Sequence, residues 1–246
     1  MSESITRIEL VGALVPAHAI DTTAILDALS GSAQTLTYGG TFTGRPGTTL
    51  FCSKELVVKL RAELSYAPRD MLRWIELALE KERRLGIHAP SKTWFIAHRA
   101  TGPVIANATP RLQALHDLGQ VDGNTLLPLL SKVVEICLRT AARHELRLDE
   151  GLSNFGTDAA GAVYYLDDET YPWDNFVGLT QMLGVWIRQL DGLDAATARQ
   201  LGAHLRQCIL DEFGDEHAAR IVAEELRGTL AVTERQSATR DACVAA

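Results

Sequence analysis

Three side chains near the middle of the chain have the types and the spacing that metal-assisted group transfer requires. Asp149 is followed five residues later by Asn154, and Asp167 lies thirteen residues after Asn154. A carboxylate can orient or deprotonate an acceptor hydroxyl, and carboxylate and amide oxygens are the hard ligands that Mg²⁺ prefers. This set can therefore supply what the transfer of a γ-phosphoryl group from ATP demands of a protein.

The elements around these residues determine whether the three can meet. The segment 144–169 reads as a loop, a short strand, a turn over 157–161 and a second strand that ends at Asp167. A helix expected over 125–144 precedes it and is apolar almost all round, which is typical of a helix buried at the centre of a domain. The other interpretation is that the three polar residues only cap local backbone in turns.

The Asp-x-x-x-x-Asn spacing with an acid after the next strand resembles the protein-kinase-like superfamily, over roughly residues 33–190. It is more similar to the aminoglycoside, choline and atypical bacterial kinase branches than to eukaryotic protein kinases. The resemblance implies that Asp149 is the catalytic base and that Asn154 and Asp167 hold Mg²⁺ on ATP. It also implies a cleft between two lobes as the nucleotide site.

The same resemblance requires a lysine on a central strand and a glutamate on the following helix. The run 55–60 (Glu-Leu-Val-Val-Lys-Leu) looks like the family's V-A-I-K strand, so Lys59 is expected to contact the α- and β-phosphates. Glu76, on a helix expected over 68–85, is the implied partner of Lys59, and Glu80 on the next turn is the alternative.

A glycine-containing segment, 38–47, lies where the resemblance implies a phosphate-covering loop. Gly39, Gly40 and Gly44 would let backbone N–H groups approach phosphates, although the segment is not a G-x-G-x-x-G. The same residues suit an ordinary hairpin turn.

The departures from the family pattern bear on the acceptor. Gly151 stands where the loop lysine of protein kinases would lie, and no long activation segment separates Asp167 from Asp174. Both features favour a small-molecule hydroxyl acceptor over a protein. They also keep open a catalytically silent kinase-fold protein that binds a nucleotide or acts as a scaffold, and an interaction protein of another fold.

The period of the hydrophobic pattern changes partway along the chain and predicts an α+β, two-lobed, protein-kinase-like fold. Residues 1–106 are expected to form a small β-rich lobe with one helix, and residues 107–230 a helical lobe that carries the hairpin. The expected strands are 34–38, 48–52, 55–60, 93–98 and 104–106, and the expected later helices are 111–118, 125–144, 175–190, 194–213 and 215–226. Residues 231–246 are expected to be a flexible tail.

Composition narrows the class of protein. With 246 residues, 46% of them hydrophobic, the chain can bury a sizeable core, and a net charge of −7 argues against a nucleic-acid partner. The four cysteines are far apart, without the local CxxC spacing of a zinc site or a disulfide framework, which favours the cytoplasm. No stretch approaches the ~18 apolar residues of a membrane span, and oligomeric state is left open.

Overall fold

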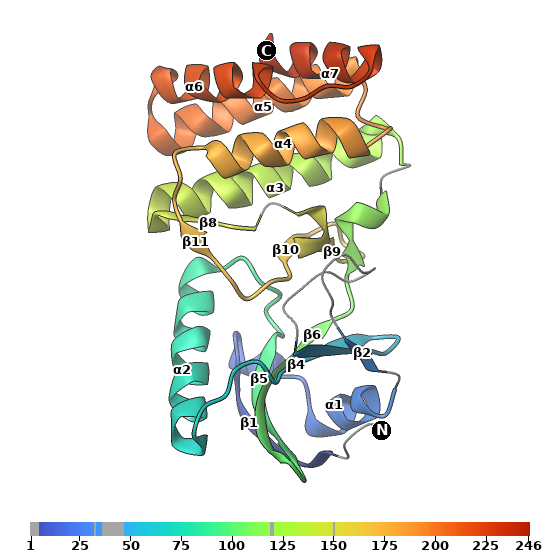
Figure 1. Cartoon of the computed structure of the whole chain (residues 1–246), viewed down its shortest axis with the longest axis vertical. Helices are drawn as coiled ribbons and strands as arrows, with labels where there is room; N and C mark the ends of the chain where they lie inside the picture. The colour runs from blue at the N-terminus through green and yellow to red at the C-terminus, as the bar shows by residue number, and fades with distance from the viewer. Residues whose placement is uncertain (1–4, 32, 36–46, 119–120, 150) are drawn as a thin grey trace. The chain divides into compact units, whose positions relative to one another are not determined.

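The computed structural model describes residues 5–31, 33–35, 47–118, 121–149 and 151–246. The chain contains both helices and strands and divides into two compact units, residues 1–111 and 112–246 (Figure 1). Among the described helices, none combines the length and the apolar character needed to cross a bilayer.

The first unit is built on one antiparallel sheet of six strands, in the order β1-β5-β6-β4-β3-β2. The strands are β1 (Ile5–Ala13), β2 (Ala33–Thr35), β3 (Thr48–Cys52), β4 (Leu56–Arg61), β5 (Thr93–Arg99) and β6 (Gly102–Pro110). Strand β4 is internal, and Lys59 on it lies opposite Leu50 of β3 and Asn107 of β6.

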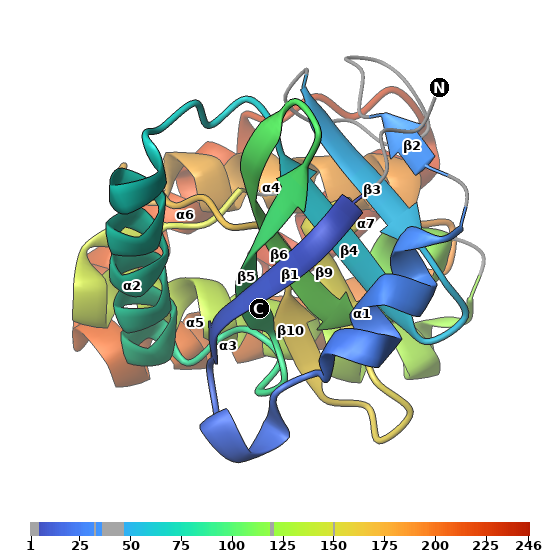
Figure 2. The same ribbon diagram turned by 90° about the horizontal axis from the view of Figure 1, so that it is seen from below.

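Two helices pack on opposite faces of this sheet (Figure 2). Successive residues of a strand point to opposite faces, so Phe95 packs with α1 (Thr22–Leu29) while Trp94 packs with α2 (Pro68–Leu85). The prediction of one helix in this part of the chain was therefore wrong. Helix α1 has only eight residues, and β1 shows no clean alternation, so neither left a strong periodic signal.

Other elements of the first unit match the sequence pattern closely. Helix α2 has the predicted bounds and ends at Gly86, whose φ of 64° lies in the left-handed region that glycine adopts without strain. Strand β3 also has its predicted bounds, and the strongly buried strands β5 and β6 contain the apolar runs that marked them. A single 3₁₀ turn, η1 (Pro16–His18), links β1 to α1.

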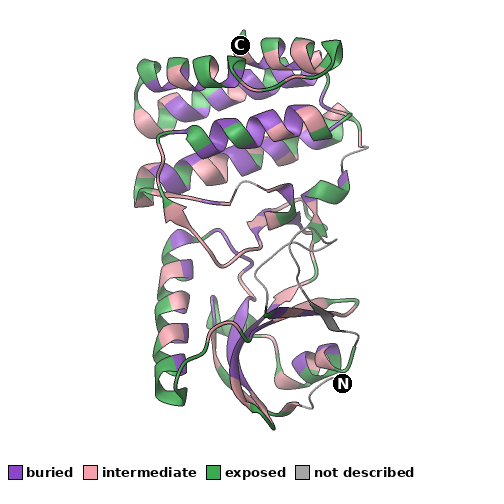
Figure 3. Cartoon of the chain, in the orientation of Figure 1, coloured by how far each residue is buried: buried purple, intermediate pink, exposed green. Residues whose placement is uncertain are grey.

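The second unit is mainly helical. Its helices are α3 (Gly123–His144), α4 (Val177–Gln189), α5 (Ala195–Phe213), α6 (Glu216–Arg227) and α7 (Glu234–Val244). Helix α5 packs against α3, α6 and α7, and the contacting sides of these helices are buried (Figure 3). Trp186 and Leu138 are completely buried in this core.

Short strands and 3₁₀ turns complete the second unit. Strands β10 (Val163–Tyr165), β9 (Phe155–Thr157) and β7 (Gln113–Ala114) form one small sheet, and β8 (Leu146–Arg147) pairs with β11 (Tyr171–Pro172). The 3₁₀ turns are η2 (Leu115–Leu118) and η3 (Leu152–Asn154). The helix predicted over 111–118 is thus a two-residue strand followed by a 3₁₀ turn.

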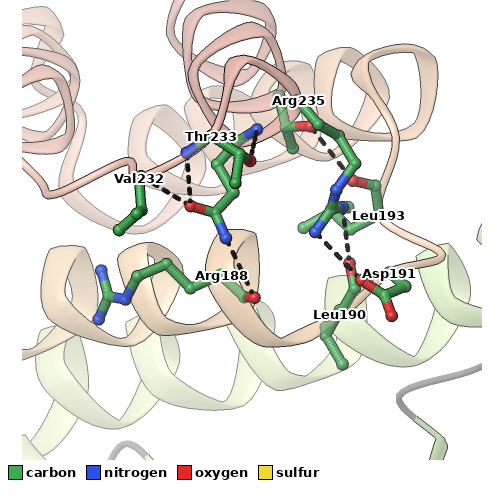
Figure 4. A network of polar contacts seen from close by, with 9 residues as sticks. Arg188, Leu190, Asp191, Leu193, Val232, Thr233 and Arg235 are labelled. Carbon is green, nitrogen blue, oxygen red and sulfur yellow. Dashed lines mark hydrogen bonds and ion pairs between the residues drawn. The ribbon is translucent and has the colours of Figure 1, made fainter.

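The last residues form an ordered helix, so the predicted flexible tail was also wrong. Thr233 and Gln236 make a capping box at the start of α7, and the Gln236 amide donates to the carbonyl of Arg188 at 3.4 Å (Figure 4). Arg235 reaches Asp191 at 3.2 Å, between Oδ1 and the guanidinium. The small residues of this segment, which suggested a tail, are what allow α7 to pack closely: Ala242 and Cys243 are buried.

Candidate functional site

The end of helix α3 determines where the segment that carries Asp149 begins. Glu145, with a φ of 54°, ends the helix in the left-handed conformation and turns the chain into β8. Strand β8 pairs with β11, and Leu148 is buried directly after it. Asp149 therefore begins a loop whose upstream end is fixed by pairing and burial.

The β9–β10 hairpin brings Asn154 next to the end of the second strand. Phe155 lies opposite Tyr165, and the Leu166 N–H donates to the Asn154 carbonyl at 2.8 Å. The turn is closed by Asp158, whose Oδ1 accepts from the N–H groups of residues 160 and 162 at 2.9 Å. Asn154 directly precedes β9 and Asp167 closely follows β10, so the two residues lie at the same end of this hairpin.

The side chains of Asp149 and Asn154 both lie next to Gly151. A Cβ placed on Gly151 would lie 3.3 Å from Asn154 Nδ2 and 3.9 Å from Asp149 Oδ1, and 3.2 Å from Ser153 Oγ. Asp149 Oδ1 also accepts from the Gly151 N–H at 3.3 Å. A side chain at residue 151 would therefore contact Ser153, Asn154 and Asp149, and glycine leaves that space open.

The hydroxyl of Tyr165, which the sequence reasoning missed, ties the two acidic arms together. It accepts from the backbone N–H of Asp149 at 3.0 Å and donates to the carbonyl of Glu169 at 2.9 Å. Tyr165 is almost completely buried, with its ring against Phe155. This buried phenol fixes the loop that carries Asp149 relative to the segment that carries Asp167.

The charges of Asp149 and Asp167 act on the same two tyrosines. Burial and the charges of Asp167 and Asp149 raise the pKa of Tyr165. Burial and the charges of Glu169, Asp149 and Asp167 raise the pKa of Tyr171. Since each phenol responds to both aspartates, Asp149 and Asp167 contribute to one region of negative potential, which favours a bound cation.

Asp174 has a structural role beside this region. Its Oδ2 lies 3.1 Å from the Nε of Arg147 and accepts from the N–H of Gly178 in the first turn of α4 at 3.0 Å. The guanidinium of Arg147 also stacks over the ring of Tyr171, 4.8 Å from its centroid. Oδ2 of this carboxylate is thus engaged by α4 and an arginine, whereas its Oδ1 is buried without a hydrogen-bond partner among the described residues.

In the first unit, Lys59 is half-buried on the central strand β4. Val58 and Leu60 both belong to the core beneath α1, so Lys59 points to the opposite face, the one on which α2 packs. A lysine on an internal strand whose neighbours are buried is not an ordinary solvated lysine. This position agrees with the sequence expectation for a phosphate-binding lysine, without testing it.

Helix α2 does not direct Glu76 toward the sheet that carries Lys59, contrary to the predicted pairing. Glu76 is exposed and forms an ion pair with Arg73, 3.6 Å from Oε2 to Nη1, and Glu80 is exposed too. The sequence pattern put Leu72 on the buried stripe, but the structure uses Met71 instead and leaves Leu72 exposed. That small rotation turns Glu76 to solvent.

The same rotation buries a different glutamate. Glu82 is only 2% exposed, and its carboxylate accepts from Lys92 Nζ at 2.5 Å and from Trp94 Nε1 at 2.8 Å. The apolar spacing 71, 75, 79 includes position 82 on its face, and that was the available signal. The buried acid of α2 therefore anchors the helix to the start of β5.

Asp149, Asn154 and Asp167 all lie in the second unit, in the segments that precede and follow strands β9 and β10. Gly39, Gly40 and Gly44 lie outside the described residues. No protein-family model matches the chain, and no curated protein matches it either.

Proposed function

We propose that this protein is an ATP- and Mg²⁺-dependent phosphotransferase of the kinase type, which transfers the γ-phosphoryl group to a hydroxyl of a small molecule. The observation that carries the proposal is that the side chains of Asp149 and Asn154 both lie next to Gly151, while the charges of Asp149 and Asp167 both act on the buried Tyr165. Phosphoryl transfer needs little covalent chemistry from the protein and depends on such positioning and on metal binding.

In this mechanism the two acids have different tasks. Asp149 accepts the proton of the acceptor hydroxyl or orients it toward the γ-phosphorus, while Asp167 holds Mg²⁺ on the phosphate oxygens. Asn154 would offer its amide oxygen to the metal, because the amide nitrogen is a hydrogen-bond donor and not a cation ligand. Lys59 neutralises charge on the α- and β-phosphates.

Two features support a small acceptor. Only residues 168–176 separate Asp167 from the start of α4, and β11 within them is paired with β8. This leaves little chain for a docking platform of the kind that a protein substrate needs. Gly151, in place of the lysine that protein kinases use beside the transferred phosphate, points the same way.

The alternative function is nucleotide binding without transfer, as in a silent kinase-fold protein. Gly151 is the specific observation that favours it, because the expected loop lysine would stabilise charge in the transition state. In that case ATP and Mg²⁺ would bind through Asp167, and replacing Asp149 would change nothing measurable.

The test is calorimetric titration of ATP, with and without Mg²⁺, on the Asp149→Asn and Asp167→Asn variants, together with a screen of metabolite hydroxyls coupled to ADP release. Asp149→Asn should bind MgATP nearly normally while turnover falls by about 10²-fold or more, the usual scale for a positioned base. Asp167→Asn should lose the Mg²⁺-dependent part of the ATP affinity first.

Asp158→Asn is the matched control, because it changes an acid of the same hairpin at the turn and keeps an acceptor oxygen for the backbone. It should behave as the unmodified protein. A full Mg²⁺ effect in Asp167→Asn would transfer the metal role to Asp168. If the chain shows no MgATP binding at all, or if both variants keep full activity, the kinase proposal is wrong.

A further inference from the structure

A second polar cluster lies away from the hairpin, between helices α3 and α5 of the second unit. Glu135 extends from α3, and His204 and Cys208 extend from α5 with the four-residue spacing that places two side chains on one helical face. His204 Nε2 lies 3.1 Å from Glu135 Oε1 and 3.3 Å from Cys208 Sγ. The three donor atoms all lie within 4.8 Å of one another.

Nε2 of His204 cannot make a strong hydrogen bond to Glu135 and to Cys208 at the same time. One atom, Nε2 of His204, faces both the carboxylate and the thiol, and a ring nitrogen carries at most one hydrogen. If it donates to Glu135, it cannot also accept from the thiol, and if it is unprotonated, it meets the lone pairs of the carboxylate. A nitrogen, a sulfur and an oxygen this close together are also the kinds of donor atom that bind a transition metal.

We propose that Glu135, His204 and Cys208 bind a zinc ion. Bond lengths of about 2.0–2.3 Å in a tetrahedral site require ligand atoms about 3.3–3.7 Å apart, so the two separations from Nε2 need only small adjustments. Imidazole and thiolate ligands select Zn²⁺ over Mg²⁺ and Ca²⁺, which prefer oxygen. The site is thus distinct in chemistry from the Mg²⁺ site proposed for the hairpin.

The surroundings suit an accessible cation with an open coordination position. The side chains of His204 and Glu135 are 33% and 39% exposed, while Cys208 is buried beneath them, so a metal and a fourth, water ligand can enter from the solvent side. Burial and the charges of Glu135, Asp211 and Glu212 raise the pKa of Cys208 to about 11. The metal-free cysteine is therefore a thiol, and its proton passes to the buffer as the Zn–S bond forms.

The experiment uses the full chain, stripped of metal with a chelator and then titrated with Zn²⁺ by calorimetry and with Co²⁺ by absorption spectroscopy. One equivalent of Zn²⁺ should bind, and bound Co²⁺ should show a thiolate-to-metal charge-transfer band. Cys208→Ser should abolish that band, and Cys208→Ser, His204→Gln and Glu135→Gln should each weaken Zn²⁺ binding by at least ~10-fold.

Two controls separate this site from others. Cys243→Ser changes another buried cysteine of the same unit and should leave the charge-transfer band intact, and Asp167→Asn should leave the Zn²⁺ affinity unchanged. Because Cys208→Ser changes a buried residue, the half-exposed His204→Gln is the second test, and far-UV dichroism checks the fold of each variant. Failure of the full chain to bind Zn²⁺, or unchanged Zn²⁺ affinity in both His204→Gln and Cys208→Ser, would overturn the proposal.

Discussion

At the scale of single residues, the buried hydroxyl of Tyr165 controls the geometry of the candidate site. It hydrogen-bonds both to the backbone N–H of Asp149 and to the carbonyl of Glu169, in the segment after Asp167. A catalytic carboxylate must be held within a fraction of an ångström of its working position. Under the proposed function we therefore expect Tyr165 to act as a positioning residue rather than as a group that touches the substrate.

Tyr165→Phe should destabilise the protein by about 1–3 kcal/mol, because a half-buried N–H and a carbonyl lose their partner while the ring packing is kept. Urea unfolding measures this change. Turnover should fall more than ATP affinity. Tyr164→Phe is the control, since its hydroxyl makes only a 3.3 Å contact with Asp158 in the described structure and is half-buried. Equal losses in both variants would contradict the special role of Tyr165.

At the scale of elements, helix α2 is attached to its sheet by a buried ion pair. Glu82 and Lys92 are each at most 2% exposed, and Lys92 also lies over the ring of Trp94, 5.2 Å from the centroid. Removing one partner of such a pair leaves a buried charge uncompensated, which costs far more than the pair itself contributes.

Glu82→Gln should therefore lower the free energy of unfolding by about 3–5 kcal/mol, measured by urea unfolding at neutral pH. Glu80→Gln, which changes an exposed acid on the same helix, should have little effect. A double variant, Glu82→Leu with Lys92→Met, should recover part of the loss because both charges are gone. A change below about 1 kcal/mol in Glu82→Gln would show that water or another group compensates Lys92.

Helix α7 depends on a close backbone approach to α5. A Cβ on Gly202 would lie 2.0 Å from the carbonyl oxygen of Cys243, which no side-chain movement can relieve. Gly202→Ala should thus displace α7 and cost about 1–3 kcal/mol or more. Hydrogen exchange of the α7 amides should rise together with this loss.

Gly228→Ala is the comparison for Gly202→Ala, because Gly228 has a φ of −72° and its nearest neighbour to an added Cβ is 3.3 Å away. Its effect should be small. If the amide hydrogen exchange rates of α7 are unchanged in Gly202→Ala, the close approach of α5 and α7 does not stabilise α7, and this prediction is wrong.

At the scale of the whole molecule, the proposed function assigns residues of both units to one nucleotide. A double-mutant cycle with Lys59→Ala and Asp167→Asn tests this assignment through the affinity for MgATP. Lys59→Ala should weaken ATP binding without loss of far-UV dichroism. The two effects should be coupled by about 0.5–3 kcal/mol, as expected for groups that act on the same phosphates. Strictly additive effects would contradict a shared nucleotide.

Much of the local structure could be read from the sequence. Helix α2, strand β3 and the long buried helix α3 were predicted with nearly their observed bounds, because their apolar periodicity and their glycine or polar ends are local signals. The Asp149, Asn154 and Asp167 set was also local, since a hairpin with a short turn brings its two arms together by itself. What chemistry the set performs remains a prediction.

The elements that the sequence did not reveal are those stabilised by distant partners. Strand β1 is paired with β5, some ninety residues away, and α7 is folded against α4 and α5 by contacts such as that of Arg235 with Asp191. Short or small-residue segments bury too little surface to be stable alone, so their own pattern is weak. Their structure follows from packing rather than from propensity.

The residues of the sites divide in the same way. The sequence alone placed Asp149 and Asn154 in one loop and predicted a helix over 194–213 that contains His204 and Cys208, but it did not single out those two residues as a pair. Only the tertiary structure decided that Glu135 meets His204, that Tyr165 bridges the acidic arms, and that Glu82 rather than Glu76 is buried. The burial of Glu82 and the contact of Glu135 with His204 depend on how helices pack against their neighbours, and the Tyr165 bridge depends on how the β9–β10 hairpin lies against the segments beside it.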